Sequence, residues 1–340
     1  STKLAALTAE YRKLEAELAE PRRAPGFLEA EGFDMPLFVR GEYKQPAAIV
    51  PRRYLEVFDT KAFVTTGSGR LELAAKIAAP DNPLTARVMT NRLWHHVFGR
   101  GLVGTVDNFG RLGDQPTHPE LLDFLANRLT SQKWSLKAQL RELLLTDAFQ
   151  RSSLPTTSAQ AKDADNSLLS HVRVRRLGGE ALRDSLITLS GRMEHRMYGP
   201  GDNAMGPPHQ QVRRSVYLNI RRNSLHPLIT TFDGPKPFTT VGRRDATNVP
   251  AQSLTLLNSP FVIDTAKQWA RTLNLQKQSD ADKVDTLFVQ ALAREATPAE
   301  QAAAARYLAD LKVTHADQPA MVWADFAQSV LNLKEFLYLK

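Results

Sequence analysis

Apolar residues recur at helical spacing through most of this chain, and proline or glycine separates one such stretch from the next. Residues 121–129, for example, carry Leu121, Leu122, Leu125 and Leu129 on one side of a helix. The same spacing marks residues 84–98, 136–149, 179–192, 260–273, 280–294, 297–312 and 319–336. Because this periodicity is typical of helices that bury one face, we predict a mainly α, multi-helix globular domain. Long ordered loops and one or two short strands, at residues 36–40 and 214–220, complete the expected fold.

The first 68 residues differ from the rest. Residues 1–20 predict an amphipathic helix that continues from a missing upstream region, and Pro21 ends it. Residues 21–68 are irregular and rich in proline and glycine, but their apolar content favours an extended arm over a linker. Gly67-Ser68-Gly69 marks the boundary to a main helical domain over residues 69–340.

Composition limits the classes of partner. The chain has 44 basic and 36 acidic side chains and no cysteine, which excludes disulfides, thiolate metal sites and covalent haem attachment. A formal net charge of +8 permits anionic partners such as sulfated or uronic polysaccharide. No nucleic-acid motif occurs, and no apolar run reaches the roughly 20 residues of a membrane helix, so we expect neither nucleic-acid binding nor membrane insertion.

The segment 91–119 concentrates unusual residues. His95 and His96 precede a glycine-rich loop, and His118 follows Thr117 at the start of a new helix. These histidines have no recognised metal-binding spacing, so we expect no metal site. Thr117 instead predicts a helix cap, with His118 as a helix-start residue before Pro119.

Asp107 and Asn108 open a second question in the same segment. In Asp107-Asn108-Phe109-Gly110, both polar side chains favour a turn through local backbone hydrogen bonds. The functional alternative makes Asp107 a general base or a ligand of a sugar hydroxyl. The pattern favours the turn.

Arginines form the most informative set. They cluster at Arg92, Arg100, Arg111, Arg175, Arg176, Arg213, Arg214, Arg221, Arg222, Arg243 and Arg244. Their forks match carboxylate and sulfate groups of a ligand, or the protein's own Glu120, Asp123, Glu180, Asp184, Asp233 and Asp245. If 214–220 is a strand, each of the pairs 213–214 and 221–222 divides between interior and solvent.

Long phrases of this chain resemble one family. They are ARVMTNRLWHHVFGRGLVGTVDNFGRLGDQPTHPELLDFLA, RRLGGEALRDSLITLSGR, RRSVYLNIRRN, TFDGPKPFTTVGRRDATNVPAQSLTLLNSPFV and WADFAQSVLNLKEFLYL. The chain is thereby similar, over roughly residues 37–340, to the planctomycete surface domain, PSD1, a domain of unknown function numbered 1553. Such domains usually form the C-terminal part of large secreted planctomycete proteins that also carry a cytochrome-c-like domain. The resemblance implies a periplasmic or cell-surface location, no cofactor in this chain, and haem only on a separate upstream domain.

These observations predict a binding or assembly module of an envelope protein. It presents an arginine-rich surface to anionic polysaccharide or docks on the upstream cytochrome-c-like domain. The alternative is an enzyme that acts on polysaccharide with acids from the central loops, which a pocket joining Arg92, His118, Asp107 and Asp233 would favour. The candidate ligand-binding residues are Arg92, His95, Asp107, Asn108, His118, Arg214, Arg222, Asp233, Arg243 and Arg244.

Overall fold

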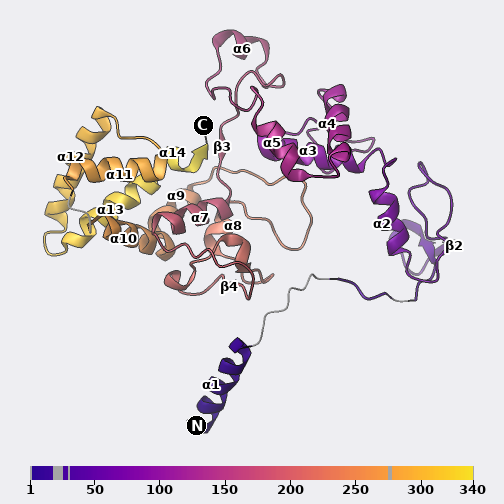
Figure 1. Cartoon of the computed structure of the whole chain (residues 1–340), viewed down its shortest axis with the longest axis horizontal. Helices are drawn as coiled ribbons and strands as arrows, with labels where there is room; N and C mark the ends of the chain where they lie inside the picture. Colours follow the sequence, from indigo (N-terminus) through magenta and orange to yellow (C-terminus); the bar gives the residue numbers. More distant parts are fainter. Residues whose placement is uncertain (1, 18–25, 30, 275–277, 340) are drawn as a thin grey trace. The chain divides into compact units, whose positions relative to one another are not determined.

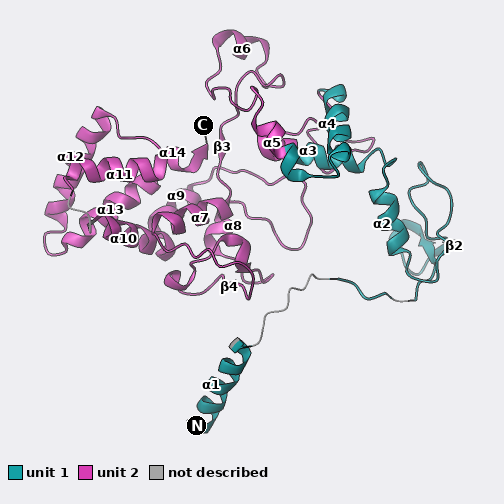
Figure 2. Ribbon diagram, in the orientation of Figure 1, with its two compact units in different colours: residues 1–93, 118–139 teal, residues 94–117, 140–340 magenta. Residues whose placement is uncertain are grey.

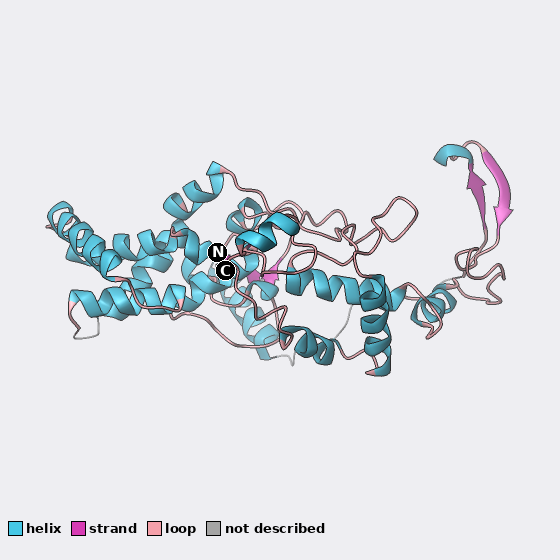
Figure 3. Ribbon diagram, turned by 90° about the horizontal axis from the view of Figure 1, so that it is seen from above, coloured by secondary structure: helices cyan, strands magenta, loops and turns pink. Residues whose placement is uncertain are grey.

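Helices dominate the protein (Figure 3), which confirms the mainly α prediction. The computed structural model describes residues 2–17, 26–29, 31–274 and 278–339. These ranges contain fourteen α-helices and six short strands, and none of their helices is both long and apolar enough to cross a bilayer. The chain divides into two compact units, residues 1–93 with 118–139 and residues 94–117 with 140–340 (Figure 2).

The first unit holds most of the N-terminal elements. They are α1 (Thr2–Glu17), β1 (Met35–Phe38), β2 (Pro46–Val50), α2 (Arg70–Ala78), the start of α3 (Thr85–Phe98), α4 (Pro119–Ser131) and the start of α5 (Leu136–Leu144). The expected N-terminal helix is present over residues 2–17, whereas residues 18–20, and 21–25 and 30 of the expected arm, lie outside the described residues. Within that arm β1 and β2 pair antiparallel.

Helix α4 begins one residue later than its predicted cap implies. Its N-cap residue is His118, whose side chain makes no capping hydrogen bond, and Pro119 takes the first helical position as expected. The prediction that Thr117 is the N-cap is wrong by one residue, since His118 takes that position, and the Thr117 hydroxyl donates to the carbonyl oxygen of Leu102. The buried face of α4 carries the predicted leucines at 122, 125 and 129.

The second unit contains the remaining elements. They are α6 (Thr157–Lys162), β3 (Arg175–Arg176), α7 (Gly179–Leu189), β4 (Asp202–Asn203), β5 (Leu218–Asn219), α8 (Pro227–Thr231), α9 (Pro250–Asn258), α10 (Pro260–Asn274), α11 (Asp280–Leu292), α12 (Pro298–Thr314), α13 (Pro319–Leu331), α14 (Lys334–Leu337) and β6 (Tyr338–Leu339). Helix α10 packs against α13 (Figure 1). Trp269 of α10 is fully buried in this core, and its indole N–H donates to Gln290 Oε1 at 2.6 Å. The core includes residues of α7 and α8, which border one of the hollows described below.

The predicted strand over residues 214–220 is wrong for most of its length. Residues Ser215–Tyr217 form a 3-10 turn, and only the two residues of β5 pair in a sheet. The cause is a side chain, because Asp184 accepts hydrogen bonds from the Ser215 amide at 2.6 Å and from its hydroxyl at 2.7 Å. The carboxylate thus takes the backbone donor that a strand ladder would use.

Two fully buried arginines support the irregular backbone around this turn. Arg183 donates to the carbonyl oxygen of Arg213 at 2.9 Å, and Arg213 donates to those of Pro200 at 2.7 Å and Tyr198 at 2.6 Å. The expected division of the pair 213–214 is confirmed, since the two side chains are 0% and 64% exposed. The same expectation, that one arginine faces the interior and the other the solvent, is wrong for the pair 221–222, where both residues are exposed.

Candidate functional site

A groove lined by arginines lies within the second unit. Two adjoining hollows of about 580 and about 540 Å³ share His95, Gly99, Arg173 and Arg243 in their linings. Arg100 and Asp107 also border one hollow, and Arg175, Arg176 and Arg244 border the other. We refer to the two hollows together as the arginine groove.

The end of α3 shapes one wall of the groove. The helix ends at Phe98, and Gly99 leaves it with a φ of +82°, a conformation that favours glycine. A Cβ atom at Gly99 would lie 2.9 Å from Cδ of Arg175. Arg175 can therefore approach closely, and its Nη1 donates to the carbonyl oxygen of His96 at 2.6 Å. This carbonyl is one of those that a helix end leaves without an internal partner.

A loop between α8 and α9 forms the opposite wall, and Asp233 fixes its two ends. The Asp233 carboxylate accepts hydrogen bonds from the Thr247 amide and hydroxyl, both at 2.8 Å, and from Arg176 Nη2 at 2.6 Å. Burial raises the pKa of Asp233, but these hydrogen bonds outweigh burial, so the pKa lies below its usual value of 3.8. The bonds occupy this carboxylate, which acts as the anchor of the loop.

The tip of the same loop docks on the glycine-rich loop that follows α3. The Gly242 amide donates to Asp107 Oδ2 at 3.2 Å, and a Cβ atom at 242 would lie only 2.4 Å from Cβ of Asp107. Asn108 accepts a hydrogen bond from the Gly110 amide at 3.0 Å, as the predicted turn requires. The arrangement places Arg243 beside His95 in the groove lining.

Four arginines of the groove form no ion pair within the described residues, although Asp107, Asp114 and Asp245 also border the hollows. Arg173 donates to the carbonyl oxygens of Asp165 and Asn166, and Arg175 donates to that of His96. Arg100 and Arg243 form no hydrogen bond or ion pair within the described parts of the chain. Burial, together with His96, Arg243 and Arg175, lowers the pKa of His95 below its usual 6.5, so this ring is uncharged at neutral pH.

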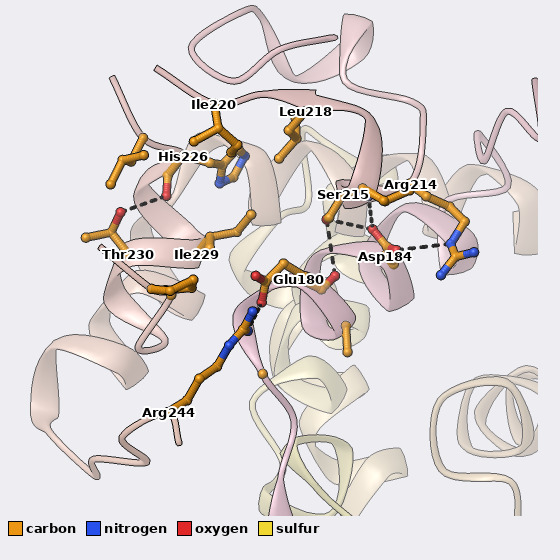
Figure 4. Close-up of a pocket in the computed structure, with 16 residues that line it drawn as sticks. Glu180, Asp184, Arg214, Ser215, Leu218, Ile220, His226, Ile229, Thr230 and Arg244 are labelled. Carbon is orange, nitrogen blue, oxygen red and sulfur yellow. Dashed lines mark hydrogen bonds and ion pairs between the residues drawn. The ribbon is translucent and has the colours of Figure 1, made fainter. Parts of the chain in front are cut away.

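A third hollow, of about 600 Å³, lies against α7 and α8 and is separate from the arginine groove (Figure 4). We refer to it as the α7–α8 hollow. Its lining includes Glu180, Asp184, Leu218, His226 and Ile229. Arg244 Nη1 lies 2.6 Å from Glu180 Oε2, and Arg214 Nε lies 3.5 Å from Asp184 Oδ2. The two arginines of this hollow are therefore paired, unlike Arg100, Arg173, Arg175 and Arg243 of the arginine groove, which form no ion pair within the described residues.

The structure brings together some of the residues singled out from the sequence. His95, Asp107 and Arg243 line the arginine groove, Arg214 lines the α7–α8 hollow, and Arg244 borders both. Asn108 and Asp233 hold loops, while Arg222 is exposed and lies over the Phe238 ring. Arg92 and His118 belong to the first unit. Within the described ranges, no group of three or more histidine, aspartate or glutamate residues could hold a metal ion.

Sequence reasoning missed three residues that matter here. Arg173 alternates with Arg175 in an extended segment, and that spacing could have placed both on one side. Arg183 precedes Leu186 and Ile187 at helical spacing, which marks it as a member of the buried face of α7. No sequence signal distinguishes His226, which is buried beside Phe261.

Comparison with protein families places the chain in a described family. A model of PSD1, described as a protein of unknown function (DUF1553), matches residues 69–308. Neither a curated protein nor a solved structure matches the chain.

Proposed function

The chain belongs to the PSD1 family, and from that premise we propose that it binds anionic polysaccharide in the arginine groove as a module of a cell-envelope protein. The observation that carries the proposal is the set of guanidinium groups in the groove without a carboxylate partner. Arg100, Arg173, Arg175 and Arg243 form no ion pair in the described ranges. Sulfate and carboxylate groups fit the planar guanidinium fork.

The shape of the groove favours a polymer over a single small ion. Its two hollows adjoin through His95 and Arg243, and each has the volume of a small-molecule site, about 300–1,000 Å³. Arg100 borders one hollow and Arg175 the other, so anionic groups on successive sugar units can each meet a guanidinium. We place the polymer in the periplasm or at the cell surface, because the family resemblance implies a secreted parent protein.

Docking on a neighbouring domain is the other form of this proposal. An upstream cytochrome-c-like domain with an acidic surface would satisfy the same guanidinium groups. Such docking predicts that the isolated chain binds acidic protein but shows no preference among sugar polymers.

An enzyme that acts on polysaccharide is the second candidate function. Asp107 and Asp114 both border the hollow that also contains Arg100, so this hollow has two carboxylates in its lining. Asp107 already accepts a hydrogen bond from Gly242, and Asp233 is occupied as a loop anchor. Release of reducing ends from polygalacturonate, lost in Asp107→Asn, would favour the enzyme over the binding module.

The binding proposal is tested with dextran sulfate and unmodified dextran, which share one backbone and differ in charge. Isothermal titration should show binding of dextran sulfate alone, with Arg100→Gln and Arg243→Gln each about tenfold weaker, as expected for loss of one charge-assisted hydrogen bond. Arg306→Gln, at an exposed position of α12, is the matched control and should bind like the parent. Equal binding of dextran, or equal affinity in all variants, would refute the proposal. Binding of duplex DNA that is tighter than binding of dextran sulfate would indicate that the groove binds nucleic acid and not polysaccharide.

A further inference from the structure

The α7–α8 hollow has the dimensions and lining of a small-molecule site. Its volume of about 600 Å³ lies within the range of about 300–1,000 Å³ that such sites occupy. Helix α7 contributes Ala181 and two carboxylates, and α8 contributes Ile229 (Figure 4). The lining of this hollow differs from that of the arginine groove because it combines aliphatic side chains with paired charges, although Arg244 borders both.

Aliphatic side chains form its floor and part of its rim. The segment that contains the 3-10 turn and β5 contributes Val216, Leu218 and Ile220 to the lining, together with Arg214 and Ser215. Leu218 and Ile229 are 6% and 9% exposed, whereas Val216 and Ile220 are 74% and 54% exposed. Exposed aliphatic side chains beside a concave apolar floor indicate that the apolar part of a ligand would be covered here.

The two arginines of the hollow are each paired with a carboxylate, so the charges of these four side chains sum to zero. Figure 4 shows Arg244 reaching Glu180 from one side and Arg214 reaching Asp184 from another, at 2.6 and 3.5 Å. A charged ligand would find no arginine or carboxylate of these two pairs without an opposite charge already beside it. The pairing therefore favours a ligand without net charge.

His226 supplies a polar group with a defined role. Gln211 Nε2 donates to the Gly206 carbonyl at 2.5 Å, so the Gln211 oxygen faces His226 Nε2 at 2.8 Å and accepts its proton. The Nδ1 atom is then an acceptor, and it has no hydrogen-bond partner within the described residues. The imidazole is 3% exposed, and burial and Arg183 lower its pKa to about 4, so the ring stays neutral.

We propose that the α7–α8 hollow binds an uncharged ligand with an aliphatic body and a hydroxyl group. The aliphatic body covers Leu218, Ile220 and Ile229. Nδ1 of His226 is closed to water in the unliganded protein, so the side chains that cover it move aside when the ligand hydroxyl donates to it. A buried acceptor without a partner is unfavourable, so this hydrogen bond distinguishes the ligand from a plain hydrocarbon.

The test uses four probes with similar aliphatic bodies: hexan-1-ol, its isomer 1-methoxypentane, hexanoate and hexylammonium. Methyl-detected NMR of the whole chain should show shifts at Leu218, Ile220 and Ile229 with hexan-1-ol. The ether, which lacks a donor, and the two ions should each bind at least fivefold more weakly. Hexanoate or hexylammonium binding as tightly as hexan-1-ol would overturn the uncharged class, and an equally tight ether would overturn the role of His226.

Two substitutions locate the site. Ala181→Trp fills the hollow from an exposed position in the first turn of α7 and should abolish the shifts. Ala299→Trp, at an exposed position in the first turn of α12, is the matched control and should leave them unchanged. If Ala181→Trp melts below its control, Ile220→Asp at the exposed rim serves as an independent variant. Binding that survives in a folded variant would place the probe elsewhere and refute the proposal.

Discussion

Arg176 donates a hydrogen bond of 2.6 Å to Asp233, and the two side chains are only 6% and 16% exposed. The same arginine donates through Nη1 to the Thr247 carbonyl oxygen at 2.8 Å. One ion pair therefore holds both ends of the loop that carries Arg243 into the arginine groove. The proposed binding surface therefore depends on a buried ion pair whose arginine is not one of the four that lack a carboxylate partner.

Asp233→Asn should destabilise the protein. The residue has a φ of +59°, which asparagine tolerates, so the substitution removes charge without adding backbone strain. Breaking a buried pair typically lowers the free energy of unfolding by about 3–5 kcal/mol. Urea unfolding measures this, with Asp245→Asn, an exposed residue of the same loop, as the control. A variant as stable as that control would show that Asp233 is not the anchor.

The lowered pKa of Asp233 also predicts that the protein loses stability in acid. Because its folded pKa lies below 3.8, the carboxylate stabilises the fold above the unfolded pKa, and this contribution is lost as pH falls through the folded pKa. The free energy of unfolding of the parent should fall more steeply than that of Asp233→Asn below about pH 4. If the free energy of unfolding of the parent and of Asp233→Asn fell in parallel below about pH 4, the stabilising role of the Asp233 carboxylate would be contradicted.

The neighbouring residues Arg213 and Arg214 should lose very different amounts of stability on the same substitution. Arg213 is fully buried, donates to three carbonyl oxygens and lies 3.9 Å from the Tyr217 ring centre. Arg213→Met leaves these acceptors without donors and should lower the free energy of unfolding by about 3 kcal/mol or more. Arg214→Met, whose parent side chain is 64% exposed, should lower it by less than about 1 kcal/mol. Similar losses in both variants would contradict the division.

His226 should titrate far below a free histidine. Burial and Arg183 lower its pKa to about 4 from the usual 6.5, so the unfolded chain binds a proton that the folded chain does not. The free energy of unfolding should therefore decrease as pH falls from about 6.5 to about 4, by up to about 3 kcal/mol from this group. NMR titration of the imidazole Cε1–H gives the pKa directly. An inflection near 6.5 would show that the ring is open to water.

Glycine at 242 should be essential to the loop contact. Gly242→Ala places a Cβ atom 2.4 Å from Cβ of Asp107, so the two loops must separate. We expect a lower melting temperature and weaker binding of dextran sulfate. Gly26→Ala, where a Cβ meets nothing within 4 Å, should change neither. An unchanged melting temperature in Gly242→Ala would show that the loops are not held together.

The sequence predicted helices well because periodic apolar faces and proline or glycine boundaries are local signals. It failed where a distant side chain competes for the backbone, as Asp184 does for the Ser215 amide. Thr117 illustrates the same point, since its hydroxyl donates to the distant Leu102 carbonyl oxygen and the N-cap of α4 is His118. Local propensity cannot report such long-range partners.

The sequence could predict the chemistry of the candidate site, but not which arginines line it. The arginine clusters indicated an anionic ligand or internal acids, and the structure contains both kinds of arginine, with Arg176 paired and Arg243 unpaired in the described ranges. Which arginine takes which role depends on the contact between Gly242 and Asp107, which joins residues 135 positions apart. That contact has no local sequence pattern.

The central claim is that unpaired arginines of the groove serve binding and not stability. The most direct measurement combines dextran sulfate affinity and melting temperature for the double variant Arg100→Gln/Arg243→Gln. We predict an affinity about a hundredfold lower with weaker salt dependence, because two guanidinium contacts are lost. We also predict a melting temperature equal to or slightly above that of the parent, because crowded like charges are removed. Unchanged affinity, or a melting temperature well below that of the parent, would contradict the account.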